Sequence, residues 1–259
     1  MSTRPLAIVT GGSGAIGLAI AARLLRGGSR VALLSRHAHT AVAARQHLLR
    51  LLTKGNDDST KLDNTPNNEV RTFRPQRLIS ADDFDSQLFA TTCDACVPGS
   101  AATALASVLS HFGSSPSSTN VSRAGSSEPR ISTLICAAGV SADALSLRQS
   151  DADIAAVLQT NLIAAMSMAR EVSRHMIRHS APVPSKGGGI DDPENDGLSA
   201  DDDRSAGCII NIGSVIGAHG GVGQTAYAAS KAGLVGMISC DPHAVFLCRI
   251  VESKNFKPA

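Results

Sequence analysis

The feature that most constrains the fold lies near the start of the chain, where an apolar run, a glycine-rich turn and a helix-forming segment follow one another. Leu6–Thr10 (LAIVT) is short and continuously apolar, which is typical of a strand buried on both faces of a parallel sheet. Gly11–Gly17 (GGSGAIG) comes next, and Leu18–Arg26 is a predicted helix that ends at Gly27 and Gly28. This order predicts the strand–turn–helix start of a parallel α/β sheet.

The same alternation of apolar strands and helices continues along the chain. Further strands are predicted at Arg30–Ser35, Leu88–Cys93, Ile131–Cys136 and Cys208–Ile212, and further helices at Ala41–Leu52, Ala101–Phe112, Asp151–His179 and Ala226–Ser239. The pattern indicates an α/β fold, a Rossmann-type doubly wound parallel sheet with helices on both faces. With 259 residues, the chain is expected to form one dinucleotide-binding domain, 1–259.

Three polar stretches interrupt this alternation. Residues 54–69, 113–129 and 181–204 are rich in Ser, Asn, Asp, Gly or Pro and lack core-forming side chains. We interpret them as surface excursions from the single domain. The last stretch of the chain, 240–259, is predicted to be an atypical tail, because Pro242 cannot continue the preceding helix.

The glycine-rich turn has the spacing of a dinucleotide-binding motif. Gly12, Gly14 and Gly17 satisfy G-x-G-x-x-G between a predicted strand and a predicted helix, the context in which this motif is informative. Glycine permits positive φ and lets backbone amides approach a pyrophosphate, while the helix N-terminus favours the phosphate charge. A plain connection is the alternative. The residues predicted to bind the cofactor here are Gly11, Gly12, Ser13, Gly14, Ile16 and Gly17.

The second strand ends in the residue that should select the cofactor. An acidic residue at this place would bind the 2′-hydroxyl of NAD, but the chain has Ser35, Arg36 and His37 instead. The Arg36 guanidinium can pair bidentately with a 2′-phosphate. The sequence therefore favours NADP, used as NADPH, over NAD. A solvent-exposed arginine without a ligand is the alternative.

The only tyrosine of the chain, Tyr227, stands in a Tyr-x-x-x-Lys pattern with Lys231. On a helix this spacing places both side chains on one face, where the ammonium favours the phenolate and lowers the tyrosine pKa. Ser214, at the end of the preceding predicted strand, could hold a substrate oxygen. Alone, the Tyr–Lys pair is common on ordinary helix surfaces.

Composition limits the partners. The net charge of +2 and the absence of a basic run favour no nucleic-acid or anionic-membrane partner. We expect no apolar stretch long enough to span a bilayer, and no secretory signal, since a strand begins at Leu6. Among the six cysteines, Cys93 and Cys96 form a lone C-x-x-C without further ligands, so we predict reduced thiols and no metal site, which fits an intracellular compartment.

Taken together in chain order, the motifs resemble the short-chain dehydrogenase/reductase family. The resemblance rests on the glycine turn, on Asp94 after the third strand, on Cys136–Gly139 (CAAG) in place of an Asn-Asn-Ala-Gly segment, on Asn161, and on Ser214, Tyr227 and Lys231. It covers Leu6 to about Ser239, apart from the three excursions.

The resemblance implies hydride transfer from NADPH to a ketone. Ser214 would hydrogen-bond the substrate carbonyl and Tyr227 would protonate the alkoxide as a general acid. Lys231 would hold the nicotinamide ribose and stabilise the tyrosinate, and Asn161 would hold a proton-relay water. The resemblance also places Asp94 at the adenine and Ala137 and Gly139 under the cofactor ribose, with Tyr227 and Lys231 contacting the cofactor as well.

Two segments are similar to the 3-oxoacyl-(acyl-carrier-protein) reductase branch of this family. They are Asn211–Gly217 and Gly223–Gly236, and Ser141–Arg148 looks like that branch's substrate-side loop. This implies a 3-oxoacyl thioester on acyl-carrier protein as substrate, in fatty-acid synthesis. It also implies a mitochondrial matrix location, with the cytoplasm as the alternative, and a homo- or hetero-oligomeric full-length form.

The chain departs from the family pattern in three places. Ala15 replaces a glycine in the turn, and Cys136 and Ala137 replace amides. After the catalytic helix, the Pro-Gly turn, substrate lid and last elements of the family are not recognisable, and His243–Val251 is apolar enough for only one strand.

We therefore hypothesise a sheet truncated after this helix, in a shortened or alternatively spliced form of low stability. The alternatives to 3-oxoacyl reduction are a carbonyl or quinone reductase of the same family and an inactive nucleotide-binding subunit.

Overall fold

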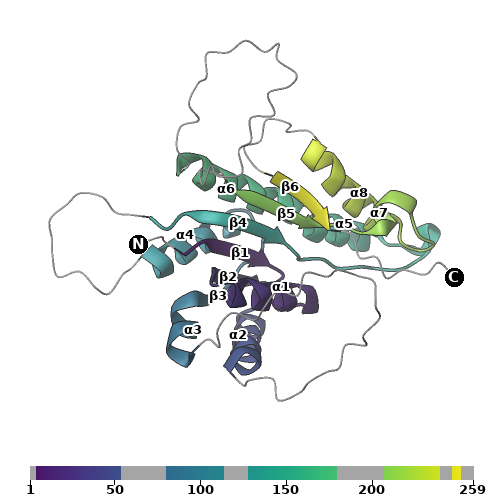
Figure 1. The fold of residues 1–259 in the computed structure, drawn as a ribbon. Helices are drawn as coiled ribbons and strands as arrows, with labels where there is room; N and C mark the ends of the chain where they lie inside the picture. Colours follow the sequence, from purple (N-terminus) through teal and green to yellow (C-terminus); the bar gives the residue numbers. More distant parts are fainter. Residues whose placement is uncertain (1–3, 54–79, 114–127, 180–206, 240–246, 252–259) are drawn as a thin grey trace, which may run out of the picture.

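The computed structural model describes residues 4–53, 80–113, 128–179, 207–239 and 247–251, and these ranges form a sheet covered by helices (Figure 1). All strands of the sheet are parallel, and their order is β3-β2-β1-β4-β5-β6. The strands are β1 (Leu6–Thr10), β2 (Arg30–Ser35), β3 (Leu88–Thr92), β4 (Ile131–Cys136), β5 (Cys208–Ile212) and β6 (Leu247–Val251). The Rossmann-type doubly wound sheet predicted from the sequence is confirmed, with the topological switch point between β1 and β4.

The helices follow the strands in the alternation that the sequence predicts. They are α1 (Ala15–Arg26), α2 (Ala38–Thr53), α3 (Ala81–Gln87), α4 (Ser100–Gly113), α5 (Asp151–Leu158), α6 (Ala164–Arg178), α7 (Val215–His219) and α8 (Thr225–Ser239). A short 3₁₀ helix, η1 (Ser146–Arg148), and a π-helical turn, η2 (Gln159–Ile163), complete the described elements. The five strands predicted between Leu6 and Ile212 lie where the sequence places them, within one residue.

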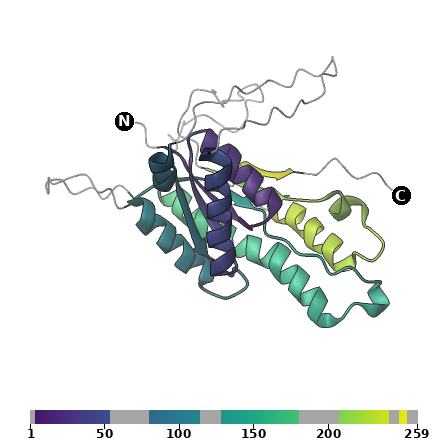
Figure 2. The same cartoon turned by 90° about the horizontal axis from the view of Figure 1, so that it is seen from below.

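Two apolar layers hold the helices on opposite faces of the sheet (Figure 2). Successive strand residues point to opposite faces. Val9 and Leu33 accordingly pack with α1 and α2, whereas Ile8 and Leu34 pack with α4 and α6 on the other side. All four side chains are buried. The continuous apolar runs that predicted buried strands are explained by this double coverage.

The helix boundaries differ from the sequence-based prediction where capping decides them. α1 begins at Ala15 rather than Leu18, because Gly14 is the extended residue that precedes the first turn. α3 was not predicted, because its sequence is polar and Phe84 is the only buried apolar residue described in it. Ser80 caps this helix: its hydroxyl accepts a hydrogen bond from the Asp83 amide at 3.1 Å. α7 was also not predicted, because five residues are too few to show a helical period.

The predicted helix Asp151–His179 is interrupted rather than continuous. α5 leads into η2, and α6 follows η2 without a break in the chain direction. A π-helical turn adds a residue to the turn and is frequent at functional sites. Thr160 and Asn161 lie in this turn with buried side chains.

Parts of the sequence-based interpretation lie outside the described residues. These parts are the excursions 54–69 and 181–204, residues 114–127 of the excursion 113–129, and residues 240–246 and 252–259 of the tail. Their interpretation stays a prediction, as does the single-domain assignment. Within the tail, the predicted strand is found as β6, which pairs in parallel register with β5 from Cys208↔Leu247 to Ile212↔Val251. β6 thus occupies the position that the sequence left open beside β5.

The expectation that no apolar stretch is long enough to span a bilayer is wrong by length and composition. The helical stretch Asp151–Arg178 is 28 residues long and has a mean hydropathy of 1.3 in its most apolar window, which is enough to cross a bilayer. In the structure its α6 part packs on β4 and α4, with Met168, Val172 and Met176 buried. We therefore interpret this stretch as a helix of the sheet's outer layer.

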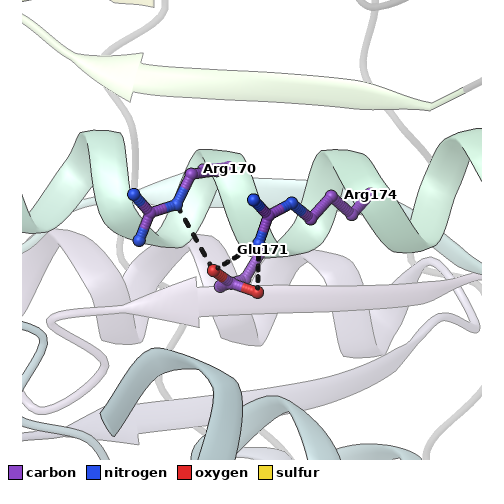
Figure 3. Close-up of polar contacts among 3 residues, drawn as sticks. All are labelled: Arg170, Glu171 and Arg174. Carbon is purple, nitrogen blue, oxygen red and sulfur yellow. Dashed lines mark hydrogen bonds and ion pairs between the residues drawn. The ribbon is translucent and has the colours of Figure 1, made fainter. Parts of the chain in front are cut away.

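The opposite face of α6 carries a cluster of charges (Figure 3). The Glu171 carboxylate accepts hydrogen bonds from Arg170 Nε at 3.3 Å and from Arg174 Nη1 at 3.2 Å, and both arginine side chains are largely exposed. Exposed ion pairs of this kind contribute about 0–1 kcal/mol each. These charged side chains show which face of α6 points away from the sheet.

Candidate active site

The glycine-rich turn packs so closely that side chains would not fit in it. Gly11 has a φ of 65°, and a Cβ on it would lie 2.6 Å from the backbone nitrogen of Ala138. A Cβ on Gly17 would lie 2.4 Å from the Gly11 carbonyl oxygen. The turn is tied to the sheet by the Gly12 amide, which donates to the Leu34 carbonyl at 3.1 Å. The first turn of α1 therefore begins directly over the carboxyl end of β1, as a pyrophosphate cradle requires.

A cavity of about 310 Å³ opens beside this turn, at the switch point between β1 and β4. Gly11, Ser13 and Gly14 line it from the turn. The predicted residues Arg36, Asp94, Ala137 and Gly139 also line it. The sequence-predicted cofactor residues of this half of the site are therefore brought together by the fold. The cavity has the location at which open α/β sheets bind ligands.

Two polar side chains at this cavity are already hydrogen-bonded to the protein. The Arg36 guanidinium is exposed and donates from Nη2 to the Thr160 hydroxyl at 3.3 Å. The Asp94 carboxylate accepts from the Cys96 amide at 3.1 Å, which fixes the loop after β3. Thr160 was not predicted as a site residue, and its place in η2 gives no sequence signal.

A second cavity, of about 770 Å³, continues from the first past Ala137 and Gly139. Ser214, Tyr227 and Lys231 all line it, together with Ile16 from α1. Most of its remaining wall is apolar, made by Ile20, Ile135, Val140, Ile210 and Ile212. The three residues predicted to carry the chemistry thus share one largely apolar cavity, where electrostatic interactions are stronger than in water.

Lys231 is the buried cation of this cavity. Its side chain is 5% exposed, and Nζ donates a hydrogen bond to the Ile212 carbonyl at 2.7 Å. Burial lowers the pKa of Lys231, because desolvation penalises the ammonium. On α8, Nζ lies 5.7 Å from the centre of the Tyr227 ring, which confirms that the two side chains share one helix face. A Cβ on Gly139 would lie 3.7 Å from the same Nζ, so the ammonium also borders the loop after β4.

Ser214 is placed by the start of α7. Its hydroxyl accepts a hydrogen bond from the Ile216 amide at 3.2 Å and so caps the helix. A Cβ on Gly217 would lie 2.9 Å from the Lys231 backbone carbon, which shows how tightly α7 packs on α8. This contact fixes Ser214 relative to Tyr227, and the Ser214 hydroxyl can still donate its own proton toward the cavity.

Asn161 acts as a clamp in the structure. Its Oδ1 accepts from the Val140 amide at 2.8 Å, and its Nδ2 donates to the Val140 carbonyl at 2.9 Å and to the Ser230 hydroxyl at 3.0 Å. The fully buried Ser230 hydroxyl in turn donates to the Tyr227 carbonyl at 2.7 Å. Asn161 therefore joins η2, the loop after β4 and α8. Its predicted role in a proton relay stays a prediction.

Sequence reasoning missed the hydrogen bonds that join the loop after β4 to the loop before α8. Gln224 donates from Nε2 to the Asp143 carboxylate at 3.3 Å, and the Ala144 amide donates to the Gly223 carbonyl at 2.9 Å. These bonds join the loop that starts at Ser141 to the loop before α8. Each bond spans elements far apart in the chain, so no local pattern could have indicated it.

The lone C-x-x-C has no bond between its sulfurs. Cys93 is buried, and its Sγ lies 3.9 Å from the Met168 sulfur. Burial raises the pKa of the Cys93 thiol, which keeps it protonated. Cys96, Cys136 and Cys208 are also free. These four cysteines are free, and their reduced state stays a prediction.

Comparison with known proteins agrees with these observations. The model of the family described as "short chain dehydrogenase" matches residues 5–75 and 197–243 of this chain. Over these residues, somewhat less than half of its length, the chain is similar to the short-chain dehydrogenases. It is 34% identical over 124 residues to carbonyl reductase family member 4 of Danio rerio, covering 48% of this chain and 39% of that protein.

The other similar proteins include 3-oxoacyl-[acyl-carrier-protein] reductases. The chain is 33% identical over 106 residues to the enzyme of Rattus norvegicus, covering 41% of this chain and 34% of that protein. In fold it is similar to a NAD⁺-bound xylitol dehydrogenase, with a TM-score of 0.61 and 21% identity over 96% of this chain and 68% of the other. The matched region spans less than half the length of the curated relatives.

Proposed function

We propose that this chain binds NADPH and reduces a 3-oxoacyl thioester to the 3-hydroxyacyl thioester. The observation that carries the proposal is the cavity shared by Ser214, Tyr227 and buried Lys231, which continues into the cavity beside the glycine-rich turn. A proton donor and a hydrogen-bond donor therefore stand where a dinucleotide bound over the turn would place its reactive end.

The chain's residues supply orientation and proton transfer, while bound NADPH would supply the hydride. The Ser214 hydroxyl would donate to the substrate carbonyl oxygen. The Tyr227 hydroxyl would give its proton to the oxygen as it becomes an alkoxide. The Lys231 ammonium would stabilise the resulting tyrosinate. Because Lys231 is desolvated, its charge acts on Tyr227 with little screening by water.

The residues of the turn fit a dinucleotide. Gly11 and Gly17 leave the space that a Cβ would fill, and α1 presents its N-terminus there. We propose NADP rather than NAD because Arg36 directly follows β2, at the place where an acidic residue would select NAD. NADPH affinity can be followed by the fluorescence of the cofactor itself, since the chain contains no tryptophan.

The cofactor proposal predicts a selective effect at Arg36. Arg36→Ala should weaken NADPH binding by roughly tenfold and leave NADH binding within about twofold, since NADH has no 2′-phosphate for Arg36 to contact. The Arg36–Thr160 hydrogen bond is lost in both cases. Arg26→Ala at the end of α1 is a control for the loss of one surface charge. Equal losses for both cofactors would contradict selection of NADP by Arg36.

The substrate proposal is tested by NADPH oxidation with purified chain. An acetoacetyl thioester, a quinone and a mixture without substrate are compared at equal enzyme concentration. Turnover with the thioester supports 3-oxoacyl reduction. Turnover with the quinone alone would refute it and support the second candidate, a carbonyl reductase, which the likeness to the Danio rerio protein favours.

A third candidate is a nucleotide-binding subunit without its own turnover. The wide cavity beside Ile210 and Ile212 favours it, because a site must exclude water to stabilise charge strongly. Tight NADPH binding without oxidation by any of the three mixtures would support this candidate and refute reduction by the chain alone.

We further propose acyl-carrier protein as the substrate carrier, the mitochondrial matrix as the compartment and an oligomeric full-length form. These proposals rest on the resemblance to 3-oxoacyl-(acyl-carrier-protein) reductases. Microscopy of the tagged protein against a matrix marker tests the compartment, and diffuse cytoplasmic staining would refute it. Light scattering during size-exclusion chromatography tests the oligomer, and a monomer mass would refute it.

A further inference from the structure

Three potential metal ligands meet far from the catalytic cavity, where α6 ends beside the start of β4. Glu128 precedes β4, and His175 and His179 stand one turn apart at the end of α6. The two imidazole rings are stacked with their centres 4.1 Å apart. One ligand atom from each of the three residues lies within 4.8 Å of the others.

The hydrogen bonds of the two histidines fix where each ring carries its proton. His175 Nε2 lies 3.1 Å from the Pro129 carbonyl oxygen, and His179 Nδ1 lies 2.8 Å from the His175 carbonyl oxygen. A carbonyl oxygen can only accept, so the neutral rings carry their protons on these two nitrogens. The other nitrogen of each ring, Nδ1 of His175 and Nε2 of His179, is therefore a free lone pair.

Both lone pairs face the same carboxylate. His175 Nδ1 is buried, has no hydrogen-bond partner among the described residues, and lies 3.9 Å from Glu128 Oε1. His179 Nε2 lies 3.0 Å from Glu128 Oε2. Two lone pairs and a carboxylate are all acceptors and cannot hydrogen-bond to one another. A cation between them would interact favourably with all three.

We propose that Glu128, His175 and His179 form a binding site for a divalent transition-metal ion, with Zn²⁺ as the best match. Two imidazole nitrogens and one carboxylate oxygen are an established donor set for Zn²⁺, with water in the remaining position. The backbone carbonyls that hold the two N–H groups are the outer partners that metal-binding histidines normally have.

The geometry requires only a small adjustment. Ligands about 2.1 Å from Zn²⁺ in a tetrahedral arrangement are roughly 3.4 Å apart. The ligand atoms now lie within 4.8 Å of one another, so the widest pair needs to close by at most about 1.4 Å. His175 is fully buried and serves as the fixed ligand, whereas His179 and Glu128 are partly exposed and can rotate inward. Glu128 also leaves the site open to solvent, which gives the ion a path of entry.

The local electrostatics favour a cation on balance. The carbonyl end of α6 carries negative partial charge, and Glu128 adds a full charge. Arg178 faces the cluster as an opposing positive charge. Burial lowers the pKa of His175, which favours the neutral form of the ring that binds metals. The alternative is a protonated His179 paired with Glu128 and no metal.

Zinc binding to the purified full chain, stripped with a chelator, separates these possibilities. Titration by calorimetry and by competition with a chelating dye should give one tight site per chain. Glu128→Gln and His179→Ala should each weaken this site at least tenfold, by loss of a ligand. His39→Ala is the matched control, since His39 stacks on His37 at the surface and should leave Zn²⁺ binding unchanged.

Two further measurements keep the proposal falsifiable. Co²⁺ in the site should give visible absorption without a sulfur-to-metal band, which excludes the cysteines as ligands. Zn²⁺ should raise the melting temperature of the parent chain by a few degrees and not that of His179→Ala. The proposal is overturned if His179→Ala binds Zn²⁺ as tightly as the parent chain, or if the parent chain binds none. NADPH binding should be unaffected by either variant, so this outcome is independent of the proposed reductase activity.

Discussion

The two halves of the sheet are covered differently. Strands β1, β2 and β3 have α1, α2 and α3 on one face and α4 on the other (Figure 1). The apolar residues of β1 and β2 are buried, whereas Phe89 and Ala90 of β3 are half-buried. Strands β4, β5 and β6 have α6 and α8 on one face. On their other face, the described residues leave the apolar cavity beside Ile210 and Ile212.

The difference assigns separate tasks to the two halves. The half that is covered on both faces ends in the glycine-rich turn, which suits the binding of a cofactor. The partly covered half carries Ser214, Tyr227 and Lys231 around an open cavity, which suits a substrate that must enter and leave. The following predictions test this division, beginning with the largest expected effect.

Tyr227→Phe should separate chemistry from binding. Removing the hydroxyl removes the proton donor, so we expect ketone reduction to fall by about 10²–10⁴-fold. NADPH affinity should change by less than about twofold, because the cradle lies in the other half. Steady-state NADPH oxidation and cofactor fluorescence measure the two effects. Turnover at the parent rate would show that Tyr227 is not the donor.

Truncation of one apolar side chain in each half should reveal the difference in packing. Leu33→Ala removes a fully buried side chain between β2 and α1, so we expect a loss of about 2–5 kcal/mol in the free energy of unfolding. Ile212→Ala acts on a half-buried side chain at the open cavity, and we expect less than half of that loss. Urea denaturation compares the two, and equal losses would mean that the cavity is as closely packed as the core.

Gly11→Ala should damage the cradle by steric conflict. Gly11 combines a φ of 65° with a Cβ position 2.6 Å from the Ala138 nitrogen. Gly28→Ala is the matched control, since Gly28 has a φ of 83° and open space around it. The control should cost about 1–2 kcal/mol for its backbone conformation alone. Gly11→Ala should lower the free energy of unfolding by more than Gly28→Ala does, and it should also weaken NADPH binding. Equal effects of the two variants on stability and on NADPH binding would refute a close-packed cradle.

The smallest expected effect is a pH dependence from Lys231. Burial lowers its pKa in the folded chain, so the unfolded chain binds more protons between that pKa and the ordinary value of about 10.4. Below the folded pKa the cost of burying the charge is fully present, and it disappears as the pH rises through this window. Stability of the parent chain should therefore rise with pH relative to Lys231→Met. Parallel curves from urea melts would contradict this.

The sequence predicted the strands better than the short helices between them. Leu6–Thr10 and Arg30–Ser35 were placed correctly because buried parallel strands are short, continuous apolar runs. α3 was not predicted because a single buried apolar residue cannot show a helical periodicity. Ser80 followed by Asp83 is a capping signal that could have indicated this helix.

The site's connections could not be predicted, for a different reason. The Asn161 clamp on Val140 and Ser230 joins three segments that meet only in the folded sheet. The cluster of Glu128, His175 and His179 was not predicted either. Glu128 lies beside His179 only because β4 pairs with its neighbours and α6 packs on the sheet. Local patterns encode elements, whereas these contacts depend on the topology.

A crystal structure of the full chain with NADPH tests the central claim most directly. We expect the pyrophosphate over Gly11–Gly17, the 2′-phosphate at Arg36, and the nicotinamide in the cavity with Ser214, Tyr227 and Lys231. The dinucleotide would then span both halves of the sheet. A cofactor bound elsewhere, or one whose nicotinamide lies outside the cavity that Tyr227 lines, would contradict the account.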